Sequence, residues 1–135
     1  MPRRVSMSKK ILLADDEIHI LRAAEMTARR AGYDVQIARD GAEAWEMVQR
    51  QRPDVLVTDV QMPRMDGLEL TRQIRGNARL KDLPILMLTA KGYELEPHEM
   101  AEKWGVLDVL TKPFSPRELV RQIDQIVGGA AVATR

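Results

Sequence analysis

Five short apolar segments alternate with stretches of helical periodicity, and this alternation limits the folds that the chain can adopt. The apolar segments are residues 11–14, 35–38, 55–58, 85–88 and 107–110. After each of them, apolar side chains recur at the spacing of one helical face, as shown by Ile18, Leu21, Ala24 and Ala28, by Ala44, Trp45 and Val48, by Leu70 and Ile74, by Met100 and Trp104, and by Leu119, Val120, Ile123, Ile126 and Val127. A strand followed by a helix, five times over, predicts an α/β fold with a doubly wound parallel sheet and helices on both faces.

The composition of the five segments predicts their order in the sheet. The first, third and fourth segments are almost continuously apolar, as expected for central strands that are buried on both faces. The second and fifth segments contain Gln36 and Asp108, as expected for strands at the edges. Two edge strands and three central strands fit a five-stranded sheet of order 2-1-3-4-5.

One domain accounts for the 135 residues. We expect this domain to span residues 9–127, after a flexible basic arm at 1–8 and before a flexible tail or the start of a linker at 128–135. The arm lacks the apolar core of a secretory signal, and no apolar run is long enough to span a membrane, so we expect a cytoplasmic protein. The absence of cysteine excludes disulfides and thiolate metal sites, and a net charge of +1 gives no indication of a nucleic-acid or membrane partner.

Polar residues gather directly after four of the five predicted strands. The carboxyl ends of parallel strands meet at one edge of the sheet, which is where ligands bind in such folds. The residues that should converge there are Asp15, Asp16 and Glu17, then Thr58 and Asp59, then Thr89 and Ala90, and finally Thr111, Lys112 and Pro113.

This set of side chains suggests phosphoryl chemistry. Neighbouring carboxylates repel one another unless a cation compensates them, and Mg²⁺ is the cation that carboxylates and phosphates usually share. The single carboxylate of Asp59 can act as a nucleophile toward phosphorus. Lys112 and the hydroxyl of Thr89 could then stabilise the charge of the transferred group.

Four motifs in these positions resemble the receiver domain of two-component response regulators. They are ILLADDE at 11–17, PDVLVTDVQMPRMDG at 53–67, MLTA at 87–90 and TKPF at 111–114. The resemblance runs from Lys9 to Val127, and in length the chain is similar to a stand-alone CheY-like member. It implies the flavodoxin/CheY-like (βα)5 fold, for which the strand order above is typical.

The resemblance also implies a metal site and a phosphoacceptor. Asp59 would accept the phosphoryl group and bind Mg²⁺ (or Mn²⁺). Asp16 would be a direct metal ligand, Asp15 would help to hold the metal through water, and the backbone carbonyl of Gln61 would complete the protein ligands.

Further roles follow from the same resemblance. Thr89 and Lys112 would contact the phosphoryl group, Ala90 would leave space for it, and the bond before Pro113 would be cis. The chain departs from the commonest family pattern at Val109, where many members carry Tyr or Phe, and in a loop after Thr89 that is one residue longer and contains Gly92 and Pro97. Gln61 and Lys91 stand at the two positions that tune phosphoryl lifetime in the family.

As a receiver, the chain would be a signalling domain that promotes its own Mg²⁺-dependent phosphorylation and dephosphorylation, not a conventional enzyme. Its phosphoryl donor would be a sensor histidine kinase or a histidine phosphotransfer protein. Its downstream protein target would bind a face made of the helix at 97–104, the strand at 107–110 and the helix at 116–127. It would bind neither nucleic acid directly nor a membrane, and it would be a monomer or a phosphorylation-dependent dimer.

Two other functions remain open at this stage. The chain could be the receiver part of a larger regulator with an output domain elsewhere, or an interaction scaffold that works without phosphorylation. At residue level, Asp15, Asp16 and Glu17 could simply be an acidic cluster at a helix N-terminus, where the helix dipole favours negative charge. Sequence motifs of flavodoxin-like cofactor binders, dinucleotide enzymes and nucleotide hydrolases are absent.

Overall fold

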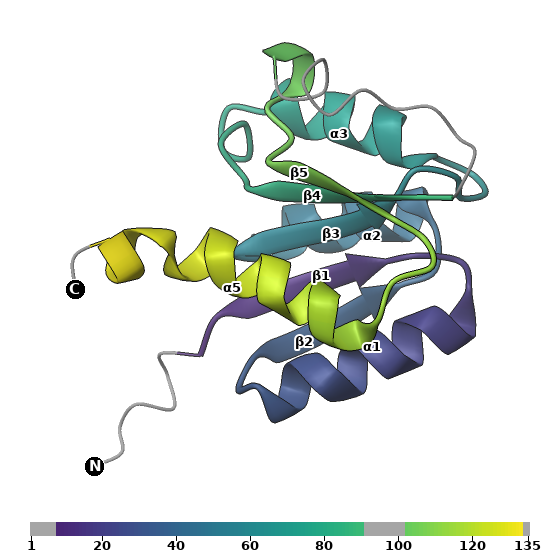
Figure 1. The fold of residues 1–135 in the computed structure, drawn as a ribbon. Helices are drawn as coiled ribbons and strands as arrows, with labels where there is room; N and C mark the ends of the chain where they lie inside the picture. The colour runs from purple at the N-terminus through teal and green to yellow at the C-terminus, as the bar shows by residue number, and fades with distance from the viewer. Residues whose placement is uncertain (1–7, 91–101, 134–135) are drawn as a thin grey trace.

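A computed structural model describes residues 8–90 and 102–133, and its centre is a five-stranded parallel sheet (Figure 1). The strand order is β2-β1-β3-β4-β5, which confirms the predicted order. The strands are β1 (Lys10–Ala14), β2 (Asp34–Ala38), β3 (Val55–Asp59), β4 (Ile85–Thr89) and β5 (Asp108–Thr111). The predicted edge strands carry the exposed side chain of Gln36 and the half-buried side chain of Asp108, whereas β3 and β4 are buried throughout.

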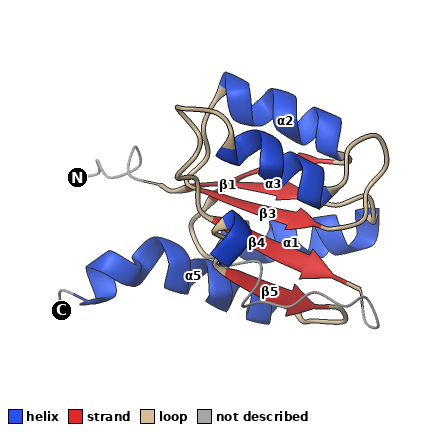
Figure 2. Cartoon of the chain, turned by 90° about the horizontal axis from the view of Figure 1, so that it is seen from above, coloured by secondary structure: helices blue, strands red, loops and turns tan. Residues whose placement is uncertain are grey.

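Helices cover both faces of the sheet, as the alternation predicts (Figure 2). The helices α1 (Ile18–Arg30) and α5 (Pro116–Ala133) lie on one face, and α2 (Gly41–Arg50) and α3 (Gly67–Arg75) lie on the other. Residues 102–104 form a helical turn shortly before β5. The helix predicted at 97–104 otherwise lies outside the described residues, as do Lys91 and most of the predicted basic arm. Within the described part of the chain, we find no helix whose length and apolarity would let it cross a membrane.

The period of two along β1 separates the core into two layers. Leu12 packs with Leu56 and Ile74 on the side of α2 and α3, while Ile11 and Leu13 pack toward α1 and α5. Full burial of one such side chain contributes about 1.5–3 kcal/mol to folding. The sheet is therefore held from both sides, and its carboxyl edge is a rigid platform.

Local capping explains where three of the helices begin. The carboxylate of Asp40 accepts a hydrogen bond from the backbone N–H of Glu43 at 2.8 Å, and that of Asp66 accepts one from Glu69 in the same way at 2.8 Å. Ser115 and Glu118 exchange side chain-to-backbone hydrogen bonds, each of 3.1 Å, in a capping box that precedes α5. Ser115 is thus the N-cap that the sequence predicts.

The helix α5 ends later than expected. The sequence predicts a flexible tail or the start of a linker at residues 128–135, whereas α5 continues through residues 128–133 to Ala133. Alanine has the highest helix propensity, and adding residues to an existing helix costs much less than starting one. The alanines after Gly129 can therefore extend a helix that the apolar stripe upstream has already formed, even without a periodicity of their own.

Candidate functional site

The register of the strands brings the predicted polar residues to one edge of the sheet. Ala14 pairs with Thr58, so that Asp15 and Asp59 each follow directly at the carboxyl ends of neighbouring strands. On the other side of β3, Asp59 pairs with Leu88, one residue before Thr89. Thr89 in turn pairs with Thr111, which precedes Lys112. The register thus brings Asp15, Asp59, Thr89 and Lys112 to one edge of the sheet.

The ammonium group of Lys112 lies among three carboxylates. Its Nζ is 2.9 Å from Oδ2 of Asp15 and 3.4 Å from Oδ2 of Asp59, and its closest contact of the three is with Oε1 of Glu17. The side chain of Lys112 is only 12% exposed, and those of Asp15 and Asp59 are 1% and 7% exposed. By contrast, the side chain of Glu17 is 57% exposed. Lys112 is therefore the cationic partner of two buried acids, Asp15 and Asp59, and of one exposed acid, Glu17.

Glu17 was not among the metal ligands predicted from the sequence. Ligand oxygens of Asp15, Glu17 and Asp59 all lie within 4.8 Å of one another, and in the described part of the chain these three residues form the carboxylate group that could hold a cation. Asp16 is exposed and is not part of this group. The only sequence signal for Glu17 is its position directly after the acid pair, two residues beyond Asp15.

Backbone contacts orient the two buried carboxylates. Oδ1 of Asp15 accepts a hydrogen bond from the N–H of Glu17 at 3.0 Å, and Oδ1 of Asp59 accepts one from the N–H of Val60 at 3.0 Å. Both acids consequently keep Oδ2 toward Lys112. The contact between Asp15 and Lys112 is an ion pair without the angles of a hydrogen bond.

A buried hydroxyl at this edge has no hydrogen-bond partner among the described residues. Thr89 is 3% exposed, and its Oγ1 makes no hydrogen bond to any described residue. A buried hydroxyl without a hydrogen bond lowers the stability of the fold. The hydroxyl of Thr89 is therefore well placed to donate a hydrogen bond to an oxygen atom of a bound ligand. Ala90 and Gln61 are exposed, and the peptide bond between Lys112 and Pro113 is cis, as expected.

Burial and like charge shift the pKa values of these groups. Burial, with the nearby charge of Asp15, raises the pKa of Asp59 to about 6 against the opposing effect of Lys112. Burial likewise raises the pKa of Asp15. Burial acts to lower the pKa of Lys112, but its contacts with Glu17, Asp15 and Asp59 outweigh this and raise it. Lys112 is therefore charged, while the two buried acids gain from any additional cation.

The loop after β3 approaches its own strand closely. A Cβ atom on Gly67 would lie 2.2 Å from the backbone oxygen of Asp59, which no side chain can tolerate. The N–H of Gly67 also donates a 2.8 Å hydrogen bond to the carbonyl of Val60. A second contact of the same kind joins this loop to α2, where a Cβ atom on Gly41 would lie 1.8 Å from the carbonyl oxygen of Met65. Gly67 thus allows the loop to approach the backbone of Asp59, and Gly41 allows it to approach α2.

The donor set fits Mg²⁺. This ion prefers oxygen ligands and is usually held by one or two carboxylates together with waters and phosphate oxygens. Asp15 and Asp59 supply two buried carboxylates, and burial raises the pKa of each. We conclude that the residues at this edge are compatible with a divalent cation.

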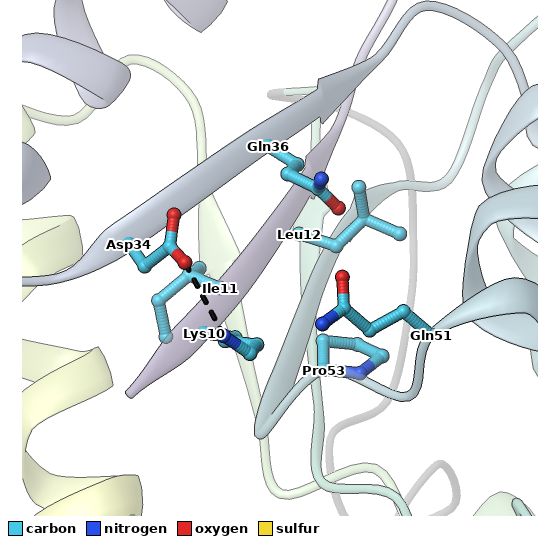
Figure 3. A pocket seen from close by; sticks show the side chains of 7 residues that line it. All are labelled: Lys10, Ile11, Leu12, Asp34, Gln36, Gln51 and Pro53. Atoms are coloured by element: carbon cyan, nitrogen blue, oxygen red, sulfur yellow. Dashed lines mark hydrogen bonds and ion pairs between the residues drawn. The ribbon is translucent and has the colours of Figure 1, made fainter. Parts of the chain in front are cut away.

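Among the hollows outside the carboxylate group, two lie at opposite ends of the sheet. One, of about 220 Å³, lies beside the site between α1 and the segment that joins β5 to α5, and its lining includes His19, Ala23, Lys112 and Phe114. The other lies at the amino-terminal ends of β1 and β2, where Lys10 and Asp34 form an ion pair of 3.4 Å (Figure 3). With about 10 Å³ it has room for one water molecule, so it is not a ligand site.

Comparison with known proteins identifies the class. Residues 11–124 match the family model of the response regulator receiver domain, and the chain belongs to this family. It is 40% identical over 127 residues to the alkaline phosphatase synthesis transcriptional regulatory protein PhoP of Bacillus subtilis. This match covers 94% of the chain but 52% of PhoP, so that the chain spans about half the length of that relative.

Solved structures agree with this assignment. The chemotaxis response regulator CheY4 of Vibrio cholerae is 35% identical, with a TM-score of 0.80 and coverage of 89% of this chain and 99% of CheY4. The receiver domain of a sensor histidine kinase from Pseudomonas aeruginosa is 33% identical, with a TM-score of 0.78 and coverage of 90% and 98% of the two chains. That domain was crystallised with a magnesium ion coordinated in its active-site cleft. The chain is thus a receiver domain of two-component signalling with the CheY-like fold.

Proposed function

We propose that this receiver domain accepts a phosphoryl group on Asp59 and thereby controls the binding of a downstream protein. The observation that carries the proposal is the environment of Asp59, which is buried at the carboxyl end of β3 with Oδ2 3.4 Å from Nζ of Lys112. The hydroxyl of Thr89, which has no hydrogen-bond partner among the described residues, lies at the end of the neighbouring strand and supports the proposal. A nucleophile, a cation and a free hydrogen-bond donor are what phosphoryl transfer requires.

In the proposed reaction, one carboxylate oxygen of Asp59 forms a bond to phosphorus. The bond between phosphorus and the donor breaks, and its electron pair leaves with the donor group, a histidine imidazole or the carboxylate of a small acyl phosphate. Asp59 must be ionised to attack, and its pKa of about 6 leaves it mostly ionised at neutral pH. Lys112 and the hydroxyl of Thr89 then contact oxygens of the transferred group.

The metal ligands in this proposal are Asp15, Asp16, Asp59 and the backbone carbonyl of Gln61. Bound Mg²⁺ would neutralise charge that develops on the phosphoryl oxygens. The role of Asp15 is supported by its burial beside Asp59. The roles of Asp16 and Gln61, which are exposed, depend on the family resemblance.

We further propose a histidine kinase or a phosphotransfer protein as the donor and a protein as the downstream partner. The partner would bind the face formed by β5, α5 and the segment before β5. Many receivers carry an aromatic residue where this chain has Val109, which is half-buried and packs against the core. Valine has few rotamers, so this position would not transmit the signal by a large side-chain rotation.

Phosphorylation by acetyl phosphate tests the proposal directly. With Mg²⁺, the intact mass of the protein should increase by one phosphoryl group, and the added group should be labile to hydroxylamine, as expected for an acyl phosphate. Asp59→Asn should remain unmodified, because an amide is not a nucleophile toward phosphorus. Asp34→Asn, which changes an aspartate at the opposite end of the sheet, is the matched control and should be modified like the wild type. Equal modification of Asp59→Asn would exclude Asp59 as the acceptor.

A further inference from the structure

We infer that Glu17 holds Lys112 away from Asp59 and so lowers the rate at which this receiver becomes phosphorylated. This inference concerns the same site and rests on the proposed function. It makes Glu17 a positioning residue, which acts on the phosphoryl group through Lys112 and not by contact with it. Its starting point is the distribution of contacts around one ammonium group.

The ammonium group of Lys112 lies at unequal distances from the three acids. Nζ lies closest to Glu17, then 2.9 Å from Asp15, and it is farthest from the phosphoacceptor, at 3.4 Å. Glu17 is also the residue that comes from the surface, with a side chain that is 57% exposed. Its carboxylate therefore reaches down to a lysine that is itself only 12% exposed.

Glu17 directly precedes α1, at the N-cap position, where its side chain could serve the helix instead of Lys112. Glu17 is the N-cap of α1, yet its side chain makes no capping hydrogen bond. N-cap positions favour Ser, Thr, Asp and Asn, whose short side chains accept hydrogen bonds from the free N–H groups of the first turn. The carboxylate of Glu17 leaves these groups without a side-chain cap and contacts Lys112 instead.

This contact competes with the proposed reaction. A phosphoryl group on Asp59 would attract Nζ of Lys112, and the contact with Glu17 opposes the movement of Nζ toward it. Lys112 can stabilise the phosphoryl group only in those molecules in which Nζ is not bound to Glu17. The average stabilisation therefore decreases as the fraction of molecules with the Glu17 contact increases. Because the carboxylate of Glu17 is exposed to solvent, its ion pair with Lys112 is weak, so we expect this effect to be about 1.5- to 5-fold.

Two substitutions of Glu17 separate its contact with Lys112 from its charge. Glu17→Gln removes the charge, whereas Glu17→Asp keeps the charge on a side chain too short for the same reach and well suited to cap α1. The rate constant of phosphorylation by acetyl phosphate is measured by intact mass at saturating Mg²⁺, with the Mg²⁺ affinity of each variant determined by calorimetry. Thermal melting checks that each variant is folded.

We expect both variants to be phosphorylated about 1.5- to 5-fold faster than the wild type. In a Lys112→Ala background, where the contact is already lost, the same two substitutions should have no effect on the rate. Independently of activity, the ¹³Cε resonance of Lys112 should shift in both variants, because the ammonium group loses its closest carboxylate.

The following results would contradict the inference. Acceleration by Glu17→Gln alone would assign the effect to the charge of the site, and a rate at or below that of the wild type in either variant would show that Glu17 does not restrain Lys112. Loss of Mg²⁺ affinity by more than about tenfold together with slower phosphorylation would make Glu17 a metal ligand. If the wild type itself is not phosphorylated, the proposed function fails first. If the wild type reacts and the variants match it, only the inference fails.

Discussion

At the scale of single residues, Asp59 is a carboxylate that the fold removes from water and places beside a second one, Asp15. Lys112 compensates this pair only in part, because it also contacts Glu17. The cost of this arrangement is visible in the raised pKa values of both buried acids. Burial thus opposes the ionisation of both acids, and a bound cation would offset this effect.

This cost predicts how stability depends on pH without Mg²⁺. The folded protein binds the proton of Asp59 more tightly than the unfolded chain does, since the pKa rises from 3.8 to about 6. The folded state is therefore favoured by this group below pH 4, and this advantage is lost as the pH rises to about 6. Urea unfolding of Asp59→Asn at pH 7.5 should show a gain of about 1 to 3 kcal/mol over the wild type, a gain that shrinks toward pH 4. A gain that is the same at both pH values, or one shared by Asp34→Asn, would contradict this prediction.

At the scale of secondary-structure elements, the loop between β3 and α3 has a glycine at the point where it meets the end of β3. Gly67 lies so close to the backbone of Asp59 that the start of α3 and the end of β3 are effectively one unit. Asp66 caps α3 directly before it. The position of Asp59, the proposed phosphoacceptor, is therefore coupled to the start of the helix that follows.

Gly67→Ala should consequently perturb both stability and chemistry. The added Cβ atom would meet a backbone oxygen at 2.2 Å, and a backbone cannot turn away as a flexible side chain can. We expect a loss of about 2 kcal/mol or more in urea unfolding and slower phosphorylation of Asp59. The control is Gly76→Ala at the end of α3, where the nearest atom would be 3.5 Å from the new Cβ and the backbone is helical. This control should change stability by less than about 1 kcal/mol, and equal effects of the two substitutions would exclude the close approach as the cause.

At the scale of the whole molecule, the two core layers turn the carboxyl edge of the sheet into a rigid support for groups that repel one another. A cation bound there stabilises the entire domain, because the unfolded chain does not keep these carboxylates together. Folding and metal binding are thereby linked.

Mg²⁺ should accordingly raise the melting temperature of the wild type in a concentration-dependent way. At a concentration 100 times the Kd, the stabilisation should be about 2.7 kcal/mol. Asp15→Asn, which removes one of the two buried carboxylates, should need far more Mg²⁺ for the same shift, as measured by differential scanning fluorimetry. Asp34→Asn should respond as the wild type does. A shift that Asp15→Asn leaves unchanged would place the cation elsewhere.

Much of the fold and of the candidate site can be predicted from the sequence. Apolar periodicity located all five strands and the core faces of α1, α2, α3 and α5, and polar residues in the second and fifth segments identified the edges. Ser115 identified the start of α5, and the rule for strand ends brought Asp15, Asp59, Thr89 and Lys112 to one edge. These features are encoded within a few residues, or follow from topology once the strand order is known.

The hydrogen-bond and ion-pair partners of the charged residues, in contrast, depend on the tertiary structure. Arg75 had no sequence signal, yet it donates hydrogen bonds to the backbone carbonyls of Lys81, Leu83, Trp104 and Gly105 and so joins the end of α3 to the segment before β5. Glu17 looked like a helix terminus, yet it contacts Lys112, 95 positions away. Such contacts depend on distances of a few ångströms between strand ends and loops, which the packing of the whole domain sets. A local pattern shows that a charged residue is present, and the fold decides which of several oppositely charged groups it meets.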